Sequence, residues 1–326
     1  MKVTVLGAGA WGTALAKVLA EGGHAITLWG HDAKRLEEVK RSGRNERYLP
    51  GVELPKGWQF ESDVARAVQG SEFVVAAVPS KAFRHVTSRM PDYAGVVVSV
   101  TKGIEYESGL TMCGILAETA PKAKAAAVSG PTFALEVAKG IPTACVVASR
   151  DPGVVGASQN LLHQPTFRVY TSLDILGVEL GGSLKNVIAV AAGVCDGLGF
   201  GDSSKAALIT RAMAEIRRLG VSCGAQGDTF AGLSGLGDLT VTCFSRLSRN
   251  RGFGERLGKG EKLEDVLGSM VAVAEGYPTA RSAYQLARKH NVMTPVIDEV
   301  YQMLYEGKNV RQGVRDLLAR DSKPED

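Results

Sequence analysis

The sequence predicts an α/β domain with a doubly wound parallel sheet, followed by an all-helical C-terminal domain, and three observations support this fold class. A glycine-rich turn joins a short β-branched run to a helical pattern near the N-terminus. Continuous apolar runs of strand length then alternate with helical segments, as in buried parallel sheets. Beyond residue 172 only helical patterns remain. With 326 residues, 45% of them hydrophobic and 22% charged, the chain is long enough to form both domains.

The glycine-rich turn lies between the expected strand Lys2–Leu6 and a helix, and its sequence is Gly7-Ala8-Gly9-Ala10-Trp11-Gly12. The first glycine permits a tight turn, the second lets the backbone approach a pyrophosphate, and the third lets the helix pack on the sheet. The N–H groups at the helix start then face the anion. We therefore expect a Rossmann-type dinucleotide site formed by Gly7, Gly9, Ala10, Trp11 and Gly12. The alternative is a purely structural turn between a strand and a helix.

Alternating segments continue the first domain to residue 172. Strands are expected at Ala25–Trp29, 72–78, 96–100, 125–129 and 144–148, and helices at Ala33–Ser42, 82–90, 110–120 and 131–138. Ser62 is expected to cap a short helix that ends at Gly70. This alternation implies right-handed crossovers between parallel strands, with ligands bound beyond the carboxyl ends of the strands.

The second domain is expected to span residues 173–320, with helices at 173–198, 203–219, 263–270, 278–289 and from Thr294 to Gly307. A charged tail at 321–326 is expected to be disordered. The most apolar helical stretch, 175–198, contains Glu179, Lys185 and Asp196. A membrane span would exclude these charges, so we expect a buried helix and no membrane span.

Composition and charge argue against several other classes of protein and site. The five cysteines are an odd number, lie far apart and include no C-x-x-C pair, so we expect neither disulfides nor a metal site. Such cysteine usage favours the reducing cytoplasm. The N-terminus begins directly with a strand and carries no export signal. A net charge of +4 is too small to indicate a nucleic-acid partner.

Seven stretches, in order and in both domains, carry a resemblance to a known family. They are GAGAWGTA at 7–14, NERYLPG at 45–51, TKG at 101–103, GPTFA at 130–134, SLKN at 183–186, GLGDLTVTC at 235–243 and SRNRGFG at 248–254. Together they resemble the bacterial-type NAD(P)-dependent sn-glycerol-3-phosphate dehydrogenases. The resemblance implies interconversion of dihydroxyacetone phosphate and sn-glycerol 3-phosphate by hydride transfer with NAD(P)H. It also implies a supply of glycerol phosphate for phospholipid synthesis, and a homodimer is the candidate assembly.

Reduction of a ketone needs a proton donor, and Lys185 is the candidate for this role. It lies on the most apolar helix of the second domain, where desolvation is expected to lower its pKa toward the working range. The alternative is a lysine at a helix boundary that reaches solvent. The resemblance makes Lys185 the general acid/base, flanked by Ser183 and Asn186. Asp238 lies in a glycine-rich segment that could bring its carboxylate to Lys185, although such segments are usually simple turns, and Thr242 is a weaker candidate.

A phosphate dianion needs several charge-assisted donors, and Ser248, Arg249 and Asn250 offer a hydroxyl, a guanidinium fork and an amide in succession. The resemblance implies that these three residues contact glycerol phosphate and that Arg249 also reaches the cofactor. Arg246 and Arg251 are interpreted as solvated surface residues.

The turn after the strand at 96–100 supplies Lys102, which is expected to point toward the same crevice and to contact substrate and cofactor. Gly130 and Thr132, at the start of a short helix, add donors for the substrate. Ala134 is expected to lie beside the nicotinamide.

The adenosine end of the cofactor site departs from the pattern of strict NAD enzymes. These place Asp or Glu after the second strand, whereas this chain has His31 there, followed closely by Lys34 and Arg35. A histidine with this basic pair could accept a 2′-phosphate, so we expect use of NADP as well as NAD. The alternative is that His31 merely starts a helix. By resemblance, Val273 and Glu275 reach the cofactor from the second domain.

We expect a two-domain dehydrogenase with its active site in the cleft between the domains. A rival interpretation is a β-hydroxyacid or sugar-acid dehydrogenase of similar architecture, which would act on an unphosphorylated hydroxy acid. A rival of another class is a catalytically silent NAD(P)-binding regulator, which would bind cofactor without turnover. The joint presence of Lys185, Asp238 and Arg249 argues against this second rival.

Overall fold

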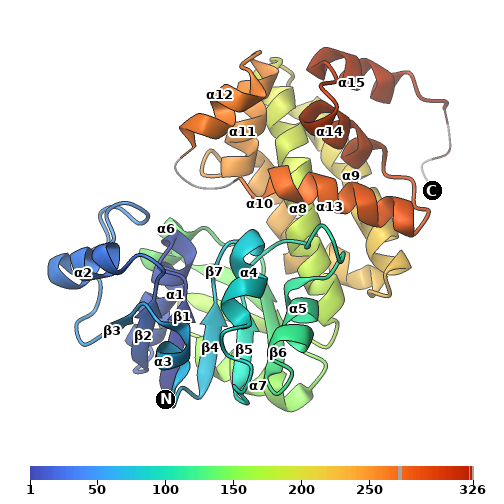
Figure 1. The fold of residues 1–326 in the computed structure, drawn as a ribbon. Helices are drawn as coiled ribbons and strands as arrows, with labels where there is room; N and C mark the ends of the chain where they lie inside the picture. The colour runs from blue at the N-terminus through green and yellow to red at the C-terminus, as the bar shows by residue number, and fades with distance from the viewer. Residues whose placement is uncertain (271–273, 323, 325–326) are drawn as a thin grey trace. The chain divides into compact units, whose positions relative to one another are not determined.

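The computed structural model describes residues 1–270, 274–322 and 324, and the chain divides into two compact units (Figure 1). Unit 1 comprises Met1–Glu105 and Leu110–Glu179, and unit 2 comprises Tyr106–Gly109 and Leu180–Asp326. The predicted fold class is confirmed, because unit 1 is built on a mostly parallel sheet and unit 2 contains helices. The division between units falls inside a helix, and the predicted domain boundary at residue 172 stays a prediction.

Unit 1 contains one eight-stranded sheet in the order β3-β2-β1-β4-β5-β6-β7-β8. The first six positions follow the order of doubly wound dinucleotide-binding sheets. The strands are β1 (Lys2–Leu6), β2 (Ala25–Trp29), β3 (Gln59–Glu61), β4 (Phe73–Ala76), β5 (Val96–Ser99), β6 (Lys124–Ser129), β7 (Thr143–Ala148) and β8 (Phe167–Ser172).

The expected parallel arrangement is wrong for one strand pair, because β7 runs antiparallel to β6. The connection between them carries only α6 (Ala134–Ala138), a helix of five residues. At about 1.5 Å per residue such a helix is much shorter than the six-residue strands it joins, which rise about 3.3 Å per residue. The chain therefore returns in the opposite direction instead of crossing back to the start of a parallel strand.

Helices cover both faces of the sheet (Figure 1). Successive strand residues point to opposite faces, so the apolar side chains on each face pack against helices. Val3, Val5 and Val75 share a core with residues of α1, α6 and α7. The intervening positions face the other helices, and there Thr4 Oγ1 donates to the Ala67 carbonyl 2.6 Å away. The helices of unit 1 are α1 (Ala10–Glu21), α2 (Ala33–Ser42), α3 (Val64–Val68), α4 (Ser80–Thr87), α5 (Met112–Thr119), α6 and α7 (Pro152–Leu162).

Sequence patterns missed the two edge strands β3 and β8 and the helix α7. In β8, Arg168, Tyr170 and Thr171 are exposed, so the strand has no continuous apolar run. The expected cap at Ser62 is also wrong. Asp63 caps α3, since its carboxylate accepts the N–H of Arg66 at 2.9 Å.

The first helix of unit 2 is α8 (Ile175–Gly197), which belongs to this unit from residue 180 onward. This helix has the length and hydropathy of a membrane span, but 94% of its most apolar window is buried inside the fold. Its apolar surface is therefore covered by packing. The remaining elements are α9 (Asp202–Ser222), the 3₁₀-helix η1 (Gly227–Ala231), the π-helix η2 (Leu233–Gly237), α10 (Asp238–Phe244), α11 (Arg249–Gly258), α12 (Leu263–Ser269), α13 (Gly276–Lys289), α14 (Pro295–Tyr305) and α15 (Val310–Leu318).

The α8 and α11 helices approach each other until their backbones touch. A Cβ atom added to Gly193 would lie 1.9 Å from the Arg251 carbonyl oxygen, and one added to Gly254 would lie 2.0 Å from that of Val190. Any larger residue at these two positions must push the helices apart. This contact brings the beginning of α11 against the middle of α8, where the candidate site of unit 2 lies.

Candidate active site

The glycine-rich turn between β1 and α1 has the geometry that a dinucleotide requires. Gly7 adopts φ +124, a conformation that side chains disfavour, and an added Cβ would lie 2.5 Å from the Ala77 carbonyl oxygen. A Cβ on Gly9 would meet nothing within 4 Å, so its backbone is open to an approaching ligand. A Cβ on Gly12 would lie 1.9 Å from the Gly7 carbonyl oxygen. These residues fit the pyrophosphate of NAD(P) at the start of α1.

Ala10 and Trp11 form the first turn of α1, and the half-buried Trp11 packs against the core. Asn45, from the loop at 45–51, stabilises the glycine-rich turn and the start of α1 through two hydrogen bonds. Its Nδ2 donates to the Ala8 carbonyl at 3.0 Å and to Thr13 Oγ1 at 2.8 Å. Sequence reasoning did not assign Asn45 a role, because its partners lie more than thirty residues away. A polar residue ahead of the turn-forming Pro50-Gly51 was the available signal.

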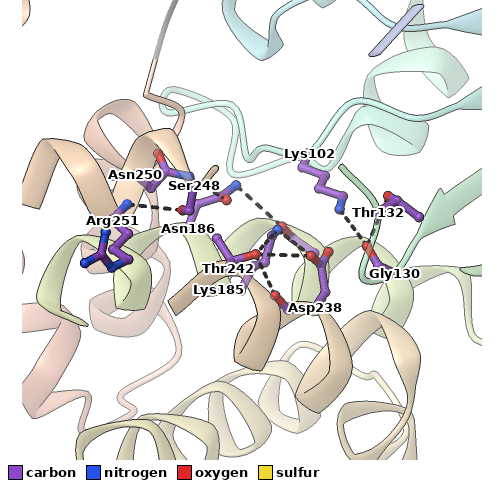
Figure 2. Close-up of polar contacts among 11 residues, drawn as sticks. Lys102, Gly130, Thr132, Lys185, Asn186, Asp238, Thr242, Ser248, Asn250 and Arg251 are labelled. Carbon is purple, nitrogen blue, oxygen red and sulfur yellow. Dashed lines mark hydrogen bonds and ion pairs between the residues drawn. The ribbon is translucent and has the colours of Figure 1, made fainter. Parts of the chain in front are cut away.

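The carboxyl ends of β5 and β6 bring three predicted substrate residues together. Lys102 Nζ donates to the Gly130 carbonyl at 3.3 Å, and Thr132 Oγ1 donates to the same oxygen at 3.2 Å (Figure 2). Ala134 begins α6 and packs beside Ala14 of α1. Unit 1 thus gathers a lysine ammonium and a threonine hydroxyl around one backbone carbonyl.

His31 lies exposed after β2, but it does not begin the helix that follows. Asp32 caps α2 by accepting the N–H of Arg35 at 3.2 Å, and its carboxylate lies 3.0 Å from Arg35 Nε. The guanidinium of Arg35 also donates to Tyr48 Oη at 2.8 Å. Lys34 is exposed. Of the expected basic group, His31 and Lys34 face solvent, whereas Arg35 is held by neighbours that the sequence did not indicate.

In unit 2, Lys185, Asp238 and Thr242 form a buried polar cluster (Figure 2). Lys185 Nζ lies 2.5 Å from Asp238 Oδ1 and donates to Thr242 Oγ1 at 2.6 Å. Thr242 Oγ1 in turn donates to the Asp238 carbonyl at 2.6 Å. The Lys185 side chain is 8% exposed and that of Asp238 1%. The ammonium is therefore fixed by an anion and a hydroxyl in a site nearly free of bulk water.

The π-helix η2 positions Asp238 as the first residue of α10. Single π-turns are rare and often occur at functional sites. A Cβ on Gly235 would lie 2.0 Å from the Phe230 carbonyl oxygen, so this turn is tightly folded. Four residues, or about one helical turn, separate Asp238 from Thr242, which puts both side chains on one face of α10.

The predicted phosphate residues lie at the beginning of α11. Ser248 Oγ accepts the N–H of Arg251 at 3.2 Å, so this side chain caps the helix. Asn250 Nδ2 donates to Asn186 Oδ1 at 2.8 Å, and its Oδ1 accepts the N–H of Gly276 at 2.9 Å. Asn250 thus ties the starts of α11 and α13 to α8. Its amide holds the turn together, which sequence reasoning did not anticipate.

Arg249 lies on the surface at the first position of α11. Although the residue as a whole is exposed, the protein around its guanidinium desolvates that group and lowers its pKa, and the nearby charge of Glu275 opposes this effect. Glu275 precedes α13, so the structure brings these two predicted cofactor residues within electrostatic range of each other. Val273, the third residue predicted to reach the cofactor from this unit, lies outside the described residues.

The interpretation of Arg251 as a solvated surface residue is wrong. Its side chain is 13% exposed, and its Nε lies 2.6 Å from Asp196 Oδ2 of α8. Arg246 is exposed, as interpreted. A run of basic residues therefore divides between solvent and the interior according to which helix each one meets.

Two family models cover most of the chain. The model described as NAD-dependent glycerol-3-phosphate dehydrogenase N-terminus matches residues 2–155, and the model described as the C-terminus of the same enzyme matches residues 174–315.

Individual relatives are similar over nearly their whole length. Glycerol-3-phosphate dehydrogenase [NAD(P)+] of Geobacter sulfurreducens is 49% identical over 99% of this chain and 98% of that protein. The protein of the same name from Syntrophotalea carbinolica is 46% identical over 100% of this chain and 99% of its own length. A crystal structure of glycerol-3-phosphate dehydrogenase from Coxiella burnetii superimposes with a TM-score of 0.94 at 37% identity, covering 98% of this chain and 99% of that chain.

Proposed function

This chain belongs to the NAD-dependent glycerol-3-phosphate dehydrogenase family, and from that premise we propose that it interconverts dihydroxyacetone phosphate and sn-glycerol 3-phosphate with NAD(P)H. The observation that carries the proposal is the buried cluster of Lys185, Asp238 and Thr242. A ketone reductase needs an ammonium held in a fixed position where water is excluded. The cluster meets both requirements.

Unit 1 is proposed to hold the cofactor. The turn at 7–12 and the start of α1 offer backbone N–H groups to the pyrophosphate, and Asn45 keeps that turn in shape. His31 and Lys34, both exposed after β2, are available to a 2′-phosphate. When bound, the dihydronicotinamide supplies the hydride. The proposed reaction requires that the hydride and the Lys185 proton reach the same carbon–oxygen bond.

Lys185 is proposed to deliver the proton from Nζ to the ketone oxygen during reduction and to accept it during oxidation. Asp238 holds the ammonium through its Oδ1, and the Thr242 hydroxyl fixes a second direction around Nζ. Because both partners are themselves buried, the ammonium loses little freedom when substrate arrives. A positive charge at this point also stabilises the alkoxide that develops in the transition state.

Arg249 is proposed to bind the substrate phosphate from the start of α11. Its guanidinium presents a planar fork that matches phosphate oxygens. Ser248 keeps its own O–H available while its oxygen caps the helix, since a hydroxyl can donate and accept together. On unit 1, Lys102 and Thr132 add a second group of donors beside Gly130.

A direct assay tests the proposed function. Purified protein is mixed with dihydroxyacetone phosphate and either NADPH or NADH, and loss of nicotinamide absorbance is followed. We expect turnover with the phosphorylated ketone and little with unphosphorylated hydroxy acids. Preferred turnover of a hydroxy acid would support the β-hydroxyacid dehydrogenase instead. Cofactor binding without turnover of any ketone would support the silent regulator.

Replacing Arg249 tests the phosphate contact. For R249A we expect kcat/KM with dihydroxyacetone phosphate to fall by about a hundredfold, because a dianion loses two charge-assisted hydrogen bonds. Activity with unphosphorylated dihydroxyacetone should hardly change. The exposed Arg246 provides the control, and R246A should leave both substrates unaffected. Equal losses on both substrates would mean that Arg249 organises the unit and does not bind phosphate.

We further infer that the enzyme acts in the cytoplasm as a homodimer and supplies glycerol phosphate for phospholipid synthesis. All five cysteines are free thiols, which suits a reducing compartment. Sedimentation of the purified protein tests the dimer. Depletion of the gene product should leave cells dependent on added glycerol phosphate.

A further inference from the structure

A second group of buried charges lies along α8 from the proposed catalytic cluster. Asp196 Oδ1 is 2.5 Å from Lys205 Nζ of α9, and its Oδ2 is 2.6 Å from Arg251 Nε of α11. The side chains of all three residues are at most 14% exposed. One carboxylate therefore joins two cations from two other helices in a nearly dry environment.

Asp196 and Lys185 lie on the same side of α8. Eleven residues separate them, which is about three helical turns and about 16 Å along the axis. The cations around Asp196 also reach the helix that carries Asp238, because Lys205 Nζ lies 5.1 Å from the ring centre of Phe244 in α10. Asp196 thus links α8 directly to α9 and α11, and Lys205 extends these contacts to α10, the helix of Asp238.

Arg251 connects this charge group to the turn at 248–250, because it contacts both. Its backbone N–H donates to Ser248 Oγ at 3.2 Å, and its side chain holds Asp196. A second carboxylate, Glu255, lies 3.2 Å from Arg251 Nη1 one helical turn further on. The direction in which α11 leaves the turn therefore depends on where Asp196 holds the Arg251 guanidinium.

We propose that Asp196 is a positioning residue, which keeps the phosphate-contacting turn at 248–250 in register by holding Arg251 against α8. The inference rests on the proposed function of that turn. Asn250 holds the same turn through Asn186, so α8 fixes it at two points, one by an amide pair and one by an ion pair. Of these two contacts, the ion pair is the one that can be lost, because the long arginine side chain can adopt another conformation once its anion is removed.

The chemistry of the substrate explains why this anion matters. A phosphate dianion brought to Arg249 competes for every cation nearby, including Arg251. With Asp196 charged, Arg251 is already neutralised and stays on α8. Without that charge, only Glu255 of α11 itself still pairs with Arg251, so the guanidinium is no longer held against α8 and can turn toward the incoming phosphate. A displacement of about 1 Å in such positioning groups can lower rates by about 100-fold.

The D196N variant tests the inference, because it removes the charge and keeps the shape of the side chain. We expect kcat/KM for dihydroxyacetone phosphate to fall by up to about 100-fold, through a higher KM. The activity with unphosphorylated dihydroxyacetone should stay close to wild type. A purely structural role would instead lower the unfolding temperature and leave KM unchanged, and that result would overturn the inference.

The partner residue supplies a second, independent variant. R251M should raise KM as D196N does, R251K should recover most of the loss, and the double variant should be no worse than D196N alone, because both act through one contact. Additive effects, or a loss that is the same for both ketones, would reject the inference.

The matched control is E299Q on α14, which breaks a comparable ion pair with Lys308 and should not change KM. If the wild-type enzyme does not reduce dihydroxyacetone phosphate at all, the proposed function fails. Normal wild-type turnover with an unchanged KM in D196N and R251M rejects only the positioning role.

Discussion

Lys185 shows how a single residue gains its chemistry from its neighbours. On a helix surface an ammonium is an ordinary solvated charge, but here a carboxylate and a hydroxyl lie within 2.6 Å of Nζ. Replacing it with methionine keeps the apolar stem and removes the proton. For K185M we expect turnover to fall by about 10²–10⁴, the usual size of general acid–base catalysis. Stopped-flow assays with saturating NADPH and dihydroxyacetone phosphate measure this loss.

Removal of a paired lysine elsewhere in unit 2 provides the control. Lys308 contacts Glu299 at 2.6 Å and Asp316 at 2.7 Å, so K308M also deletes an ion-paired ammonium. We expect K308M to keep wild-type turnover, and both variants to bind NADPH normally. A folded K185M that still turns over at nearly the wild-type rate would remove Lys185 from the mechanism, and Lys102 would be the next candidate.

His31 is the residue that we propose to meet the adenosine end of the cofactor. It is exposed after β2, in the position where strict NAD enzymes carry a carboxylate. An aspartate there would repel a 2′-phosphate and accept hydrogen bonds from ribose hydroxyls. We therefore expect H31D to shift the ratio of kcat/KM for NADPH over NADH toward NADH.

The control for this change is H85D, which places the same charge on an exposed histidine of α4 in the same unit. Its cofactor ratio should equal that of wild type. A wild-type preference for NADH of more than about a hundredfold, or roughly 2.7 kcal/mol, would contradict the assigned role of His31.

At the scale of elements, the contact between α8 and α11 decides where the turn at 248–250 lies. In G254A the new methyl group would lie 2.0 Å from the Val190 carbonyl oxygen, so one helix backbone must move. We expect a loss of about 1–3 kcal/mol in the free energy of unfolding, as for other overpacked contacts. A higher KM for dihydroxyacetone phosphate should accompany it. Denaturant unfolding and steady-state assays measure the two effects.

Two positions earlier on the same helix, Gly252 offers a matched control. A Cβ there meets no atom within 4 Å, so G252A adds the same methyl group without a collision. Because alanine favours helix more than glycine does, we expect G252A to be neutral or slightly more stable than wild type. If G252A and G254A lost the same stability, the loss would come from the helix backbone and not from packing on α8.

At the scale of the whole molecule, one buried carboxylate links stability to pH. Glu215 of α9 accepts the N–H groups of Val296 at 2.9 Å and Ile297 at 3.3 Å, which begin α14. Burial raises the pKa of Glu215 to about 7, although these hydrogen bonds oppose the shift. The folded state therefore holds this proton more tightly than the unfolded state does.

The direction of the pH dependence follows from the raised pKa of Glu215 in the folded state. The stabilising contribution is complete below the unfolded pKa of about 4.5 and is lost as pH rises through about 7. Between low and high pH, the contribution of Glu215 to the free energy of unfolding changes by at most about 3 kcal/mol. We expect E215Q, which stays neutral, to lose less stability than wild type between about pH 5 and about pH 8. Thermal unfolding at several pH values measures this difference in stability. If the unfolding temperatures of the two proteins changed in parallel with pH, Glu215 would be excluded as the titrating group.

Features that depend on nearby residues could be predicted from the sequence. The strands β1 and β2, the glycine-rich turn between β1 and α1, and the change to helices in the second half all follow from patterns within a few residues. Polar edge strands such as β8 and the π-turn before Asp238 escaped prediction, because exposed positions and rare backbone geometry leave no periodic signal.

Patterns within the sequence predicted the fold class and the family, and they named candidate residues for the chemistry. Only the tertiary structure decided which of these residues meet. Lys185 and Asp238 are 53 positions apart, and Asp196 and Arg251 are 55 apart, so no local pattern can pair them. Their contacts depend on how closely α8, α10 and α11 pack. Helix packing is set by the shapes of whole faces, and this is why the same basic run placed Arg249 at the surface and Arg251 inside.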